Sequence, residues 1–334
     1  MDGLTFRPLL ASDAPRMLEI LVAAEAAEPS ESFTDLVEVT EELTEPGMNL
    51  PEDSVAALHD GRIVGFGGLY APGPGSEWNV YLSGAVLPEF RRGGLGRTLL
   101  DRLVARAKVR HDNEHPELPG VCKMWVSQGR SGAAALAESA GFTVRRHFFT
   151  MRADLNGPPL DVGELPAGLE VRTWTPDDDE AVRLAYNGAF ADHWGSVPST
   201  PEQWQNLFAG SSFFRPEFSG LAVTGSDGNG PDWIGAAALD SPVVGFVMVA
   251  EFESETEGRG YRAGYVHLVG TVRAARGHGV ARVLLARSMA LLAESGCRYA
   301  ELGVDADSPT GAGRLYEALG YEVLRRNQIW GLDF

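Results

Sequence analysis

The apolar and polar positions of this chain follow one order of strands and helices, and that order occurs twice. Short runs of β-forming residues with alternating polarity predict strands, and capping residues before an apolar stretch of helical period predict helix starts. The paired features are the strands 3–7 and 168–172, the helix starts 12–13 and 175–178, and the strands 63–67 and 243–247. Strands that alternate with helices in this way predict a mixed α/β unit in each half.

Two later landmarks extend the repeat. A glycine-rich turn occurs at 91–96 and again at 276–281, and a glycine–aromatic pair occurs at 141–142 and again at 320–321. We therefore predict a duplicated unit of ordinary domain size, with a first domain at 1–154 and a second at 168–334. Residues 155–167 are predicted to be a linker, because an Asn-Gly-Pro-Pro run at 156–159 and a Pro-Ala-Gly run at 166–168 disfavour helix and strand.

Composition narrows the function classes. The chain has 334 residues, which suits two domains, and its 46 acidic and 28 basic side chains give a net charge of −18. So acidic a chain is a poor general binder of nucleic acid, and we expect no such partner. The apolar runs are too short to span a membrane and the N-terminus lacks a secretion signal, so we expect no membrane association and a cytoplasmic location.

Cysteine and histidine usage gives no indication of a metal. The two cysteines, Cys122 and Cys297, lie far apart in the sequence, which excludes a disulfide framework or a cysteine-rich zinc site and suits a reducing compartment. The run 111–115 holds two histidines and two acids, and we interpret it as an exposed loop because no third well-spaced ligand accompanies it. No metal is therefore predicted.

The second glycine-rich turn lies between a predicted strand, 265–272, and an apolar helical stretch that starts near 280. A strand, a glycine turn and a helix direct several backbone N–H groups and the positive helix end at one point, which suits an anion. The stretch 273–287 adds four arginines and no acid, and 91–110 is also strongly basic. A bound phosphate explains both, whereas the P-loop and dinucleotide glycine patterns are absent from the turns.

The turns carry a family resemblance. The pattern Arg-x-x-Gly-x-Gly/Ala, at 91–96 and 276–281, resembles the acetyl-CoA pyrophosphate loop of the GCN5-related N-acetyltransferases, and Leu-Tyr-Glu-Ala-Leu-Gly-Tyr at 315–321 resembles the closing motif of that family. With 190–195 and 214–217, nearly the whole chain resembles the tandem acetyltransferases of the mycothiol-synthase-like group. For each half, the resemblance implies an α/β (α+β) fold, with helices on both faces of a mixed, mostly antiparallel sheet. Acetyl-CoA would lie in a V-shaped split between two central parallel strands.

The same resemblance implies a set of residues that contact acetyl-CoA. The backbone of Val269 and Thr271 would hold the thioester and pantetheine, and Ser308 stands where the family often has asparagine. The implied contacts are Val269, Thr271, Arg276, Gly277, His278, Gly279, Val280, Ala281 and Ser308 in the second half, and Gly84, Val86, Arg91, Arg92, Gly93, Gly94, Leu95 and Gly96 in the first.

Acetyl transfer to an amine needs an unprotonated nitrogen, a polarised carbonyl and a proton for the departing thiolate. Tyr316 stands where the resemblance places a tyrosine general acid, four residues before Gly320. The equivalent residue of the first half is Ala137, which has no proton to give. We therefore predict that the chemistry belongs to the second half and that the first half is catalytically degenerate.

The sequence offers several candidates for the general base and does not decide among them. The mycothiol-synthase pattern has a glutamate on the strand before the loop, and Tyr265 stands at that position here. His267, on the same strand, is the first candidate for a base, and Glu251 and Asp240 are further ones.

The acceptor site is predicted from a short acidic and aromatic run. Asp192, His193 and Trp194 follow the first helix of the second half, and an aromatic wall beside an acid suits a cationic amine. Tyr265 is expected to line the same site. The alternative is a packing cluster at the end of the helix.

Taken together, these patterns predict an acetyl-CoA-dependent N-acetyltransferase that acts on a small-molecule amine by direct attack, as a monomer or homodimer. One alternative is a mycothiol-synthase-type acetylation of a cysteinyl pseudo-disaccharide. The other is a non-catalytic acyl-CoA-binding regulator.

Overall fold

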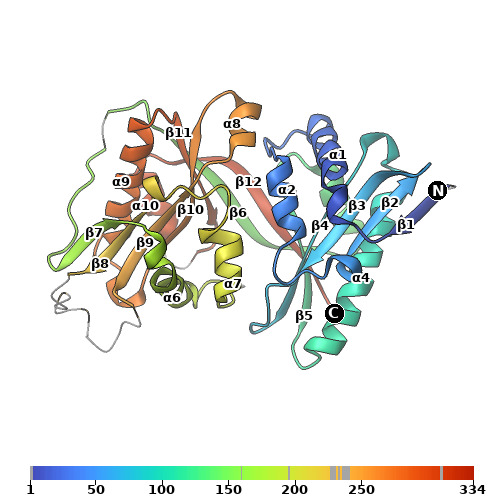
Figure 1. The fold of residues 1–334 in the computed structure, drawn as a ribbon, viewed down its shortest axis with the longest axis horizontal. Helices are drawn as coiled ribbons and strands as arrows, with labels where there is room; N and C mark the ends of the chain where they lie inside the picture. Colours follow the sequence, from blue (N-terminus) through green and yellow to red (C-terminus); the bar gives the residue numbers. More distant parts are fainter. Residues whose placement is uncertain are drawn as a thin grey trace. The chain divides into compact units, whose positions relative to one another are not determined.

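The computed structural model describes residues 3–158, 160–194, 196–225, 231, 234, 241–308 and 311–334. These residues form two compact units (Figure 1). The N-terminal unit comprises residues 1–148 with 325–334, and the C-terminal unit comprises residues 149–324.

The N-terminal unit is a sheet covered by helices on both faces. Its strands are β1 (Leu4–Arg7), β2 (Ser54–His59), β3 (Arg62–Tyr70), β4 (Trp78–Val86) and β5 (Gly120–Val126), in that spatial order. Its helices are α1 (Ala14–Ala27), α2 (Leu36–Leu43), α3 (Leu50–Asp53), α4 (Leu95–Glu114) and α5 (Ser131–Ser139). Neighbouring strands pair antiparallel except β4 and β5, which are parallel.

Glycines in β3 let helix side chains approach the sheet closely. A Cβ on Gly67 would lie 2.8 Å from the Leu103 side chain of α4, and a Cβ on Gly68 would lie 2.8 Å from Met48. Because neighbouring strand residues face opposite sides, α4 covers one face while the segment that carries α2 covers the other. The apolar core of the unit lies in these two layers.

The C-terminal unit repeats this plan. Its strands are β7 (Leu169–Thr173), β8 (Gly220–Thr224), β9 (Val243–Ala250), β10 (Ala263–Thr271) and β11 (Tyr299–Asp305). Its helices are α6 (Asp179–Phe190), α7 (Pro201–Trp204), α8 (Glu253–Arg259), α9 (Val280–Glu294) and α10 (Ala312–Ala318), with a π-helical turn at Gln205–Ala209. The strand pairs β7–β8, β8–β9 and β9–β10 are antiparallel, and β10–β11 is parallel.

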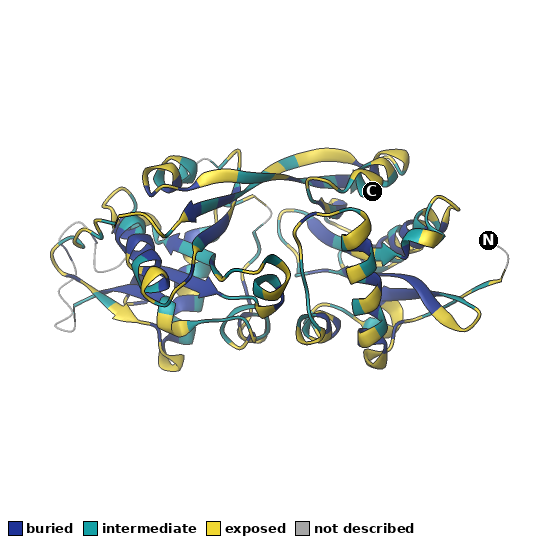
Figure 2. Cartoon of the chain, turned by 90° about the horizontal axis from the view of Figure 1, so that it is seen from above, coloured by how far each residue is buried: buried dark blue, intermediate teal, exposed yellow. Residues whose placement is uncertain are grey.

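Strand β9 lies at the centre of this unit, and all eight of its residues are buried (Figure 2). A Cβ on Gly245 would lie 2.6 Å from Val280 of α9, whereas Phe246 packs with the α6 side chains Val182 and Ala185. Helix α9 therefore covers one face of the sheet and α6 the other.

The last strand of each half is divided between the two units. Strand β6 (Thr143–Asp154) belongs to the N-terminal unit up to Phe148 and to the C-terminal unit from Phe149. Strand β12 (Glu322–Asp333) contributes its residues from Arg325 onward to the N-terminal unit, where it pairs antiparallel with β5. The boundary between the units therefore does not fall at one point in the sequence, because the C-terminal end of β12 pairs with a strand of the first half.

The predicted fold class, a mixed and mostly antiparallel sheet with flanking helices in each half, is confirmed. The interpretation of 111–115 as an exposed loop is wrong for its first four residues, which form the last turn of α4. His111 is buried there because its ring packs against Trp78 and Phe334 and its Nε2 lies 2.7 Å from the carbonyl oxygen of Leu118.

Candidate active site

The two parallel strands at the centre of the C-terminal unit separate along their length. Their pairing runs from Ala263 with Tyr299 to Val266 with Leu302 and then ends, although β10 continues to Thr271 and β11 to Asp305. Beyond this point the backbone groups of β10 that face β11 are left for another partner. The predicted V-shaped split is therefore present.

A β-bulge lies where the split opens. Strand β10 pairs with β9 through Val266 opposite Val249 and then Leu268 opposite Met248, so His267 is an extra residue in the strand. A bulge re-aims the side chains on either side of it. Val266 packs with the α9 side of the sheet and Leu268 with the α6 side.

The glycine-rich turn lies at the end of β10. Gly277 and Gly279 have φ values of +82° and +80°, which non-glycine residues adopt only with strain, and Gly279 caps α9. No heavy atom lies within 4 Å of a Cβ built on either glycine, so the turn has an open side. The first helical bond runs from Val283 N–H to the Gly279 carbonyl, and the preceding N–H groups therefore point out of the helix end, as an anion site requires.

Arg276 links this turn by hydrogen bonds to the end of β10 and to Asp192. Its Nε donates to the Thr271 carbonyl at 3.3 Å, and its Nη1 and Nη2 donate to the carboxylate of Asp192 at 2.8 and 3.0 Å. Arg273 donates to the same carboxylate at 3.3 Å. Hydrogen bonds from Arg276 hold the pKa of Asp192 well below its usual range. Asp192 thus lies against the loop arginines.

Tyr316, on α10, lies beside the split. Its side chain is buried and contacts the ring of Tyr321 at 6.0 Å between centroids. Burial, assisted by the neighbouring Tyr265, raises the pKa of Tyr316 to about 12. The phenol therefore keeps its proton at any physiological pH. Tyr265 reaches across the split, since its hydroxyl would lie 2.8 Å from a Cβ on Gly303 of β11.

His267 packs against a wall of aromatic side chains. Burial lowers the pKa of His267 to about 4, so the imidazole is neutral at pH 7. Within the described part of the chain, its buried Nδ1 has no hydrogen-bond partner. This nitrogen can therefore accept a hydrogen bond or a proton from another molecule.

Three phenylalanines complete that wall, and sequence reasoning did not single them out. Phe208 and Phe213 lie 5.6 and 5.2 Å from the His267 ring, and Phe252 stacks at 5.0 Å on Phe213 and lies 6.1 Å from Tyr265. We call Phe208, Phe213, Phe252, Tyr265 and His267 the aromatic wall. The one signal in the sequence is the Phe-Phe pair at 213–214, because the π-helical turn that carries Phe208 has no sequence pattern of its own.

The other predicted acceptor-site and cofactor-binding residues do not form one cluster. His193 packs on Phe190 at 4.5 Å, and burial lowers its pKa, whereas the Trp194 side chain is exposed. Ser308 follows β11, and α10 begins at Ala312. The base candidate Asp240 lies outside the described residues.

The other base candidate is held in an ion-pair cluster. Glu251 accepts a hydrogen bond from Arg262 at 2.8 Å and lies 3.7 Å from Arg215. Thr271, by contrast, has a buried hydroxyl that lacks a partner among the residues that the structure describes, at the end of the strand that lines the split.

A model of the acetyltransferase (GNAT) family matches residues 16–142 and again residues 197–321. The chain belongs to the GNAT family. It is 31% identical over 323 residues to a mycothiol acetyltransferase of Thermomonospora curvata, which covers 94% of each protein. Its fold matches a GCN5-related N-acetyltransferase from Sphaerobacter thermophilus with a TM-score of 0.73 and 26% identity, over 100% of this chain and 96% of the other. A tandem GNAT protein from the clavulanic acid biosynthesis pathway shares the fold, with a TM-score of 0.68 and 20% identity over 99% and 98% of the two chains.

These similarities confirm a tandem GNAT protein of the mycothiol-synthase-like group. The chain is an acyltransferase, and its family implies an acyl-CoA co-substrate and a small-molecule acceptor. Among the described helices, none is both long and apolar enough to cross a bilayer. The described residues also contain no cluster of histidine, cysteine and acidic side chains that could hold a metal ion.

The N-terminal GNAT unit has a corresponding split between β4 and β5, with different side chains beside it. Pairing of β4 with β5 ends at Leu82 opposite Met124, while β4 continues to Val86. Its register with β3 runs without interruption, so it lacks the bulge that carries His267 in β10. Ala137, which precedes Gly141 by four residues as Tyr316 precedes Gly320, is buried in α5.

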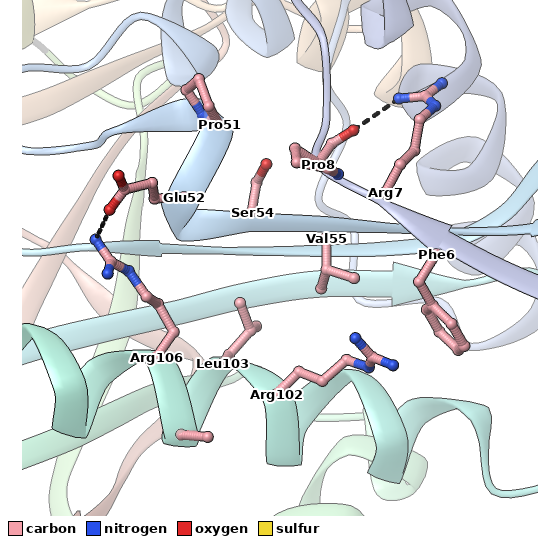
Figure 3. A pocket seen from close by; sticks show the side chains of 11 residues that line it. Phe6, Arg7, Pro8, Pro51, Glu52, Ser54, Val55, Arg102, Leu103 and Arg106 are labelled. Atoms are coloured by element: carbon pink, nitrogen blue, oxygen red, sulfur yellow. Dashed lines mark hydrogen bonds and ion pairs between the residues drawn. The ribbon is translucent and has the colours of Figure 1, made fainter.

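A cavity of about 400 Å³ lies in the N-terminal unit, at the β1–β2 edge of the sheet (Figure 3). Two of its arginines are engaged within the protein, because Arg106 pairs with Glu52 and Arg102 lies over the ring of Phe6. The split lies on the far side of β3, between β4 and β5. This cavity therefore is not part of the acyl-CoA cleft.

Proposed function

We propose that this GNAT enzyme transfers an acetyl group from acetyl-CoA to the amine of a small molecule, in the split of its C-terminal unit. The proposal is supported by three features of the C-terminal unit: an open glycine turn at the end of β10, the protonated phenol of Tyr316 and the neutral imidazole of His267. The first half of the chain has the turn and the split but neither of the other groups.

The residues present fit acetyl-CoA. The open sides of Gly277 and Gly279 leave room for a diphosphate at the start of α9. The unpaired backbone of β10, with the partnerless Thr271 hydroxyl, offers hydrogen bonds to an amide-containing pantetheine arm. This arrangement supports the predicted contacts of Val269 and Thr271 and of the turn 276–281.

Two side chains would move the protons. In a direct attack, a bond forms between the amine nitrogen and the carbonyl carbon while the carbon–sulfur bond breaks. His267 accepts the proton that the nitrogen loses, and Tyr316 donates its hydroxyl proton to the departing thiolate. Solvent then restores both groups. Holding the two reactants side by side supplies up to roughly 7–11 kcal/mol of the barrier reduction in well-oriented systems.

The high pKa of Tyr316 is compatible with this role. A thiolate enclosed in the same place is also desolvated, and burial raises the pKa of such a thiol, as it does for Cys122, whose pKa is about 12. Burial therefore raises the pKa of the proton donor and of the leaving thiol in the same direction.

A second candidate acceptor is the cysteinyl pseudo-disaccharide of the mycothiol-synthase-type reaction. It is favoured by the 31% identity to a mycothiol acetyltransferase over 94% of the chain. Assay of CoA release with that compound and with a panel of simple amines separates the two acceptor classes. Release with none of them would contradict the proposed reaction.

The pH dependence of kcat/KM should follow the pKa of the acceptor amine. His267, with a pKa lowered to about 4, is neutral above that pH, and Tyr316, with a pKa raised to about 12, is protonated below it. Neither changes state between about pH 6 and pH 10, so kcat/KM should rise as the acceptor loses its proton. Two acceptors with amine pKa values of about 8 and about 10.4 should give profiles displaced accordingly. A midpoint common to both acceptors would contradict this account.

The aromatic wall should set the affinity for the acceptor. Phe213→Ala removes the ring that lies 5.2 Å from His267. Because an aromatic contact contributes about 0.5–1.5 kcal/mol beyond its area, KM for the acceptor should rise by about two- to tenfold. The KM for acetyl-CoA serves as the internal control and should not change. A rise in the KM for acetyl-CoA alone would contradict this assignment and would indicate that Phe213 contacts acetyl-CoA instead of the acceptor.

A further inference from the structure

In the N-terminal unit, one carboxylate joins the two sides of the strand split. Glu28, immediately after α1, accepts a hydrogen bond from Arg91 Nη1 at 2.9 Å. Its other oxygen accepts from the Ser131 hydroxyl at 3.2 Å and from the Gly132 N–H at 3.0 Å. Arg91 belongs to the glycine-rich turn after β4, whereas Ser131 and Gly132 begin α5 after β5.

Arg130, just before α5, binds the end of α1 and the residues that follow it. Its Nη2 donates to Glu25 of α1 at 2.5 Å, its Nε to the Ser30 hydroxyl at 3.2 Å and its Nη1 to the Ala24 carbonyl at 3.3 Å. The backbones are also close, since a Cβ on Gly129 would lie 2.8 Å from the Pro29 carbonyl oxygen. We call the hydrogen bonds of Glu25 and Glu28 to Arg91, Arg130, Ser131 and Gly132 the carboxylate staple.

The staple crosses the route that a CoA molecule would take. A diphosphate at the start of α4 and a pantetheine arm between β4 and β5 must pass between the glycine-rich turn and the start of α5. Here the two sides are joined through a single carboxylate by bonds of 2.9 to 3.2 Å, which leave no width for the arm. The carboxylate also places negative charge where the diphosphate would enter.

Glu28 is in its charged form. Burial alone would raise its pKa, but hydrogen bonds from Gly132 and Ser131 and the charges of Arg91 and Arg130 lower the pKa of Glu28 overall. Arg91, the first arginine of the turn, is therefore paired with an internal anion, as Arg276 is in the C-terminal unit.

The C-terminal unit places its equivalent carboxylate differently. Asp192 follows α6 as Glu28 follows α1, and it too accepts from the first arginine of the turn. Its hydrogen bonds run to Arg276 and Arg273, which both lie on the turn side of the split. The turns also differ, since Arg92, with φ of +63°, stands at the position of Gly277.

We propose that the carboxylate staple closes the N-terminal split to acyl-CoA, so that each chain binds one acyl-CoA, in the C-terminal unit. The predicted contacts at Gly84, Val86 and 91–96 then serve the fold of the N-terminal unit while the staple is formed. The proposal concerns binding alone and does not depend on the identity of the acceptor or on Tyr316.

Calorimetric titration of the full chain with CoA tests the proposal. The wild type should bind one CoA per chain, and Glu25→Ala/Glu28→Ala should bind two. Glu19→Ala removes an exposed carboxylate from the same helix, where it pairs only across a turn with Arg16, and should still bind one. Two molecules bound by the wild type would overturn the proposal, as would one bound by the folded double variant.

A third variant assigns the sites and does not require the staple to be altered. Gly279→Glu blocks the C-terminal turn, and in the wild-type background it should abolish CoA binding. A remaining site in Gly279→Glu would show that the N-terminal split is open and would overturn the proposal even if the double variant fails to fold. Added to Glu25→Ala/Glu28→Ala, Gly279→Glu should leave one site. Acetyl transfer by Glu25→Ala/Glu28→Ala should remain at the wild-type rate, whether or not Tyr316 acts as proposed.

Discussion

Tyr316→Phe should lower kcat by about a hundredfold or more while leaving the Kd for acetyl-CoA unchanged. General acid catalysis contributes about 10²- to 10⁴-fold, and the substitution removes only the hydroxyl that would supply the proton. The ring, which is buried beside Tyr321, remains in place, so the cleft keeps its shape. Steady-state rates of CoA release and calorimetric titration with acetyl-CoA measure the two quantities.

Tyr321→Phe is the matched control. Tyr321 is a buried tyrosine on the adjoining turn, and in the described part of the chain its hydroxyl has no hydrogen-bond partner. Removal of an unsatisfied buried hydroxyl should leave turnover unchanged and should not lower the stability. Equal losses in both variants, or an unchanged kcat in Tyr316→Phe, would remove Tyr316 from the mechanism.

Gly279→Glu should weaken acetyl-CoA binding by at least about a hundredfold, because it puts a negative side chain beside the diphosphate at the start of α9. The open side of the turn accommodates the new side chain without a clash, as no heavy atom lies within 4 Å of its Cβ. The left-handed backbone at φ +80° adds strain of about 1–2 kcal/mol. Titration with acetyl-CoA, together with a thermal unfolding curve, separates lost binding from lost stability.

Gly94→Glu makes the same change at the same kind of position in the N-terminal unit. Gly94 caps α4 with φ of +88°, so the backbone strain is comparable. Because the carboxylate staple closes that split, Gly94→Glu should leave both acetyl-CoA binding and turnover unchanged. If Gly94→Glu abolishes binding and Gly279→Glu does not, the two units have exchanged roles.

The order of elements within each half could be predicted from the sequence because it depends on local signals. Strands such as 63–67 and 243–247 have a composition that only a buried strand tolerates, and the structure confirms them as parts of β3 and β9. The glycine-rich turns were found for a similar reason. A residue with φ near +80° at the start of a helix is nearly always glycine, so the presence of glycine at 279 allowed the turn to be predicted.

Long-range pairing could not be predicted in this way. Residues 328–333 pair with β5, which lies about two hundred residues earlier in the chain, and their alternating pattern does not identify that partner. His111 was misinterpreted for a related reason. Its burial depends on Trp78 and Phe334, which come together only in the folded sheet.

Sequence motifs predicted some residues of the candidate site, whereas residues that join the site only through contacts in the folded chain were missed. The placement of Tyr316 follows from the motif at 315–321, and its proposed role rests on that placement. Asp192 lay in a suitable segment, but the same charge that suits an amine also suits the loop arginines, and the structure pairs it with Arg276. The bulge at His267 has no sequence signal, because it is defined by the register against β9.

The most direct test of the account is a crystal structure of the full chain with acetyl-CoA. We expect the diphosphate at the N–H groups of the 276–281 turn, the thioester sulfur within hydrogen-bond reach of the Tyr316 hydroxyl, and no acetyl-CoA between β4 and β5. A diphosphate bound at 91–96 in place of 276–281, or a sulfur atom remote from Tyr316, would contradict it.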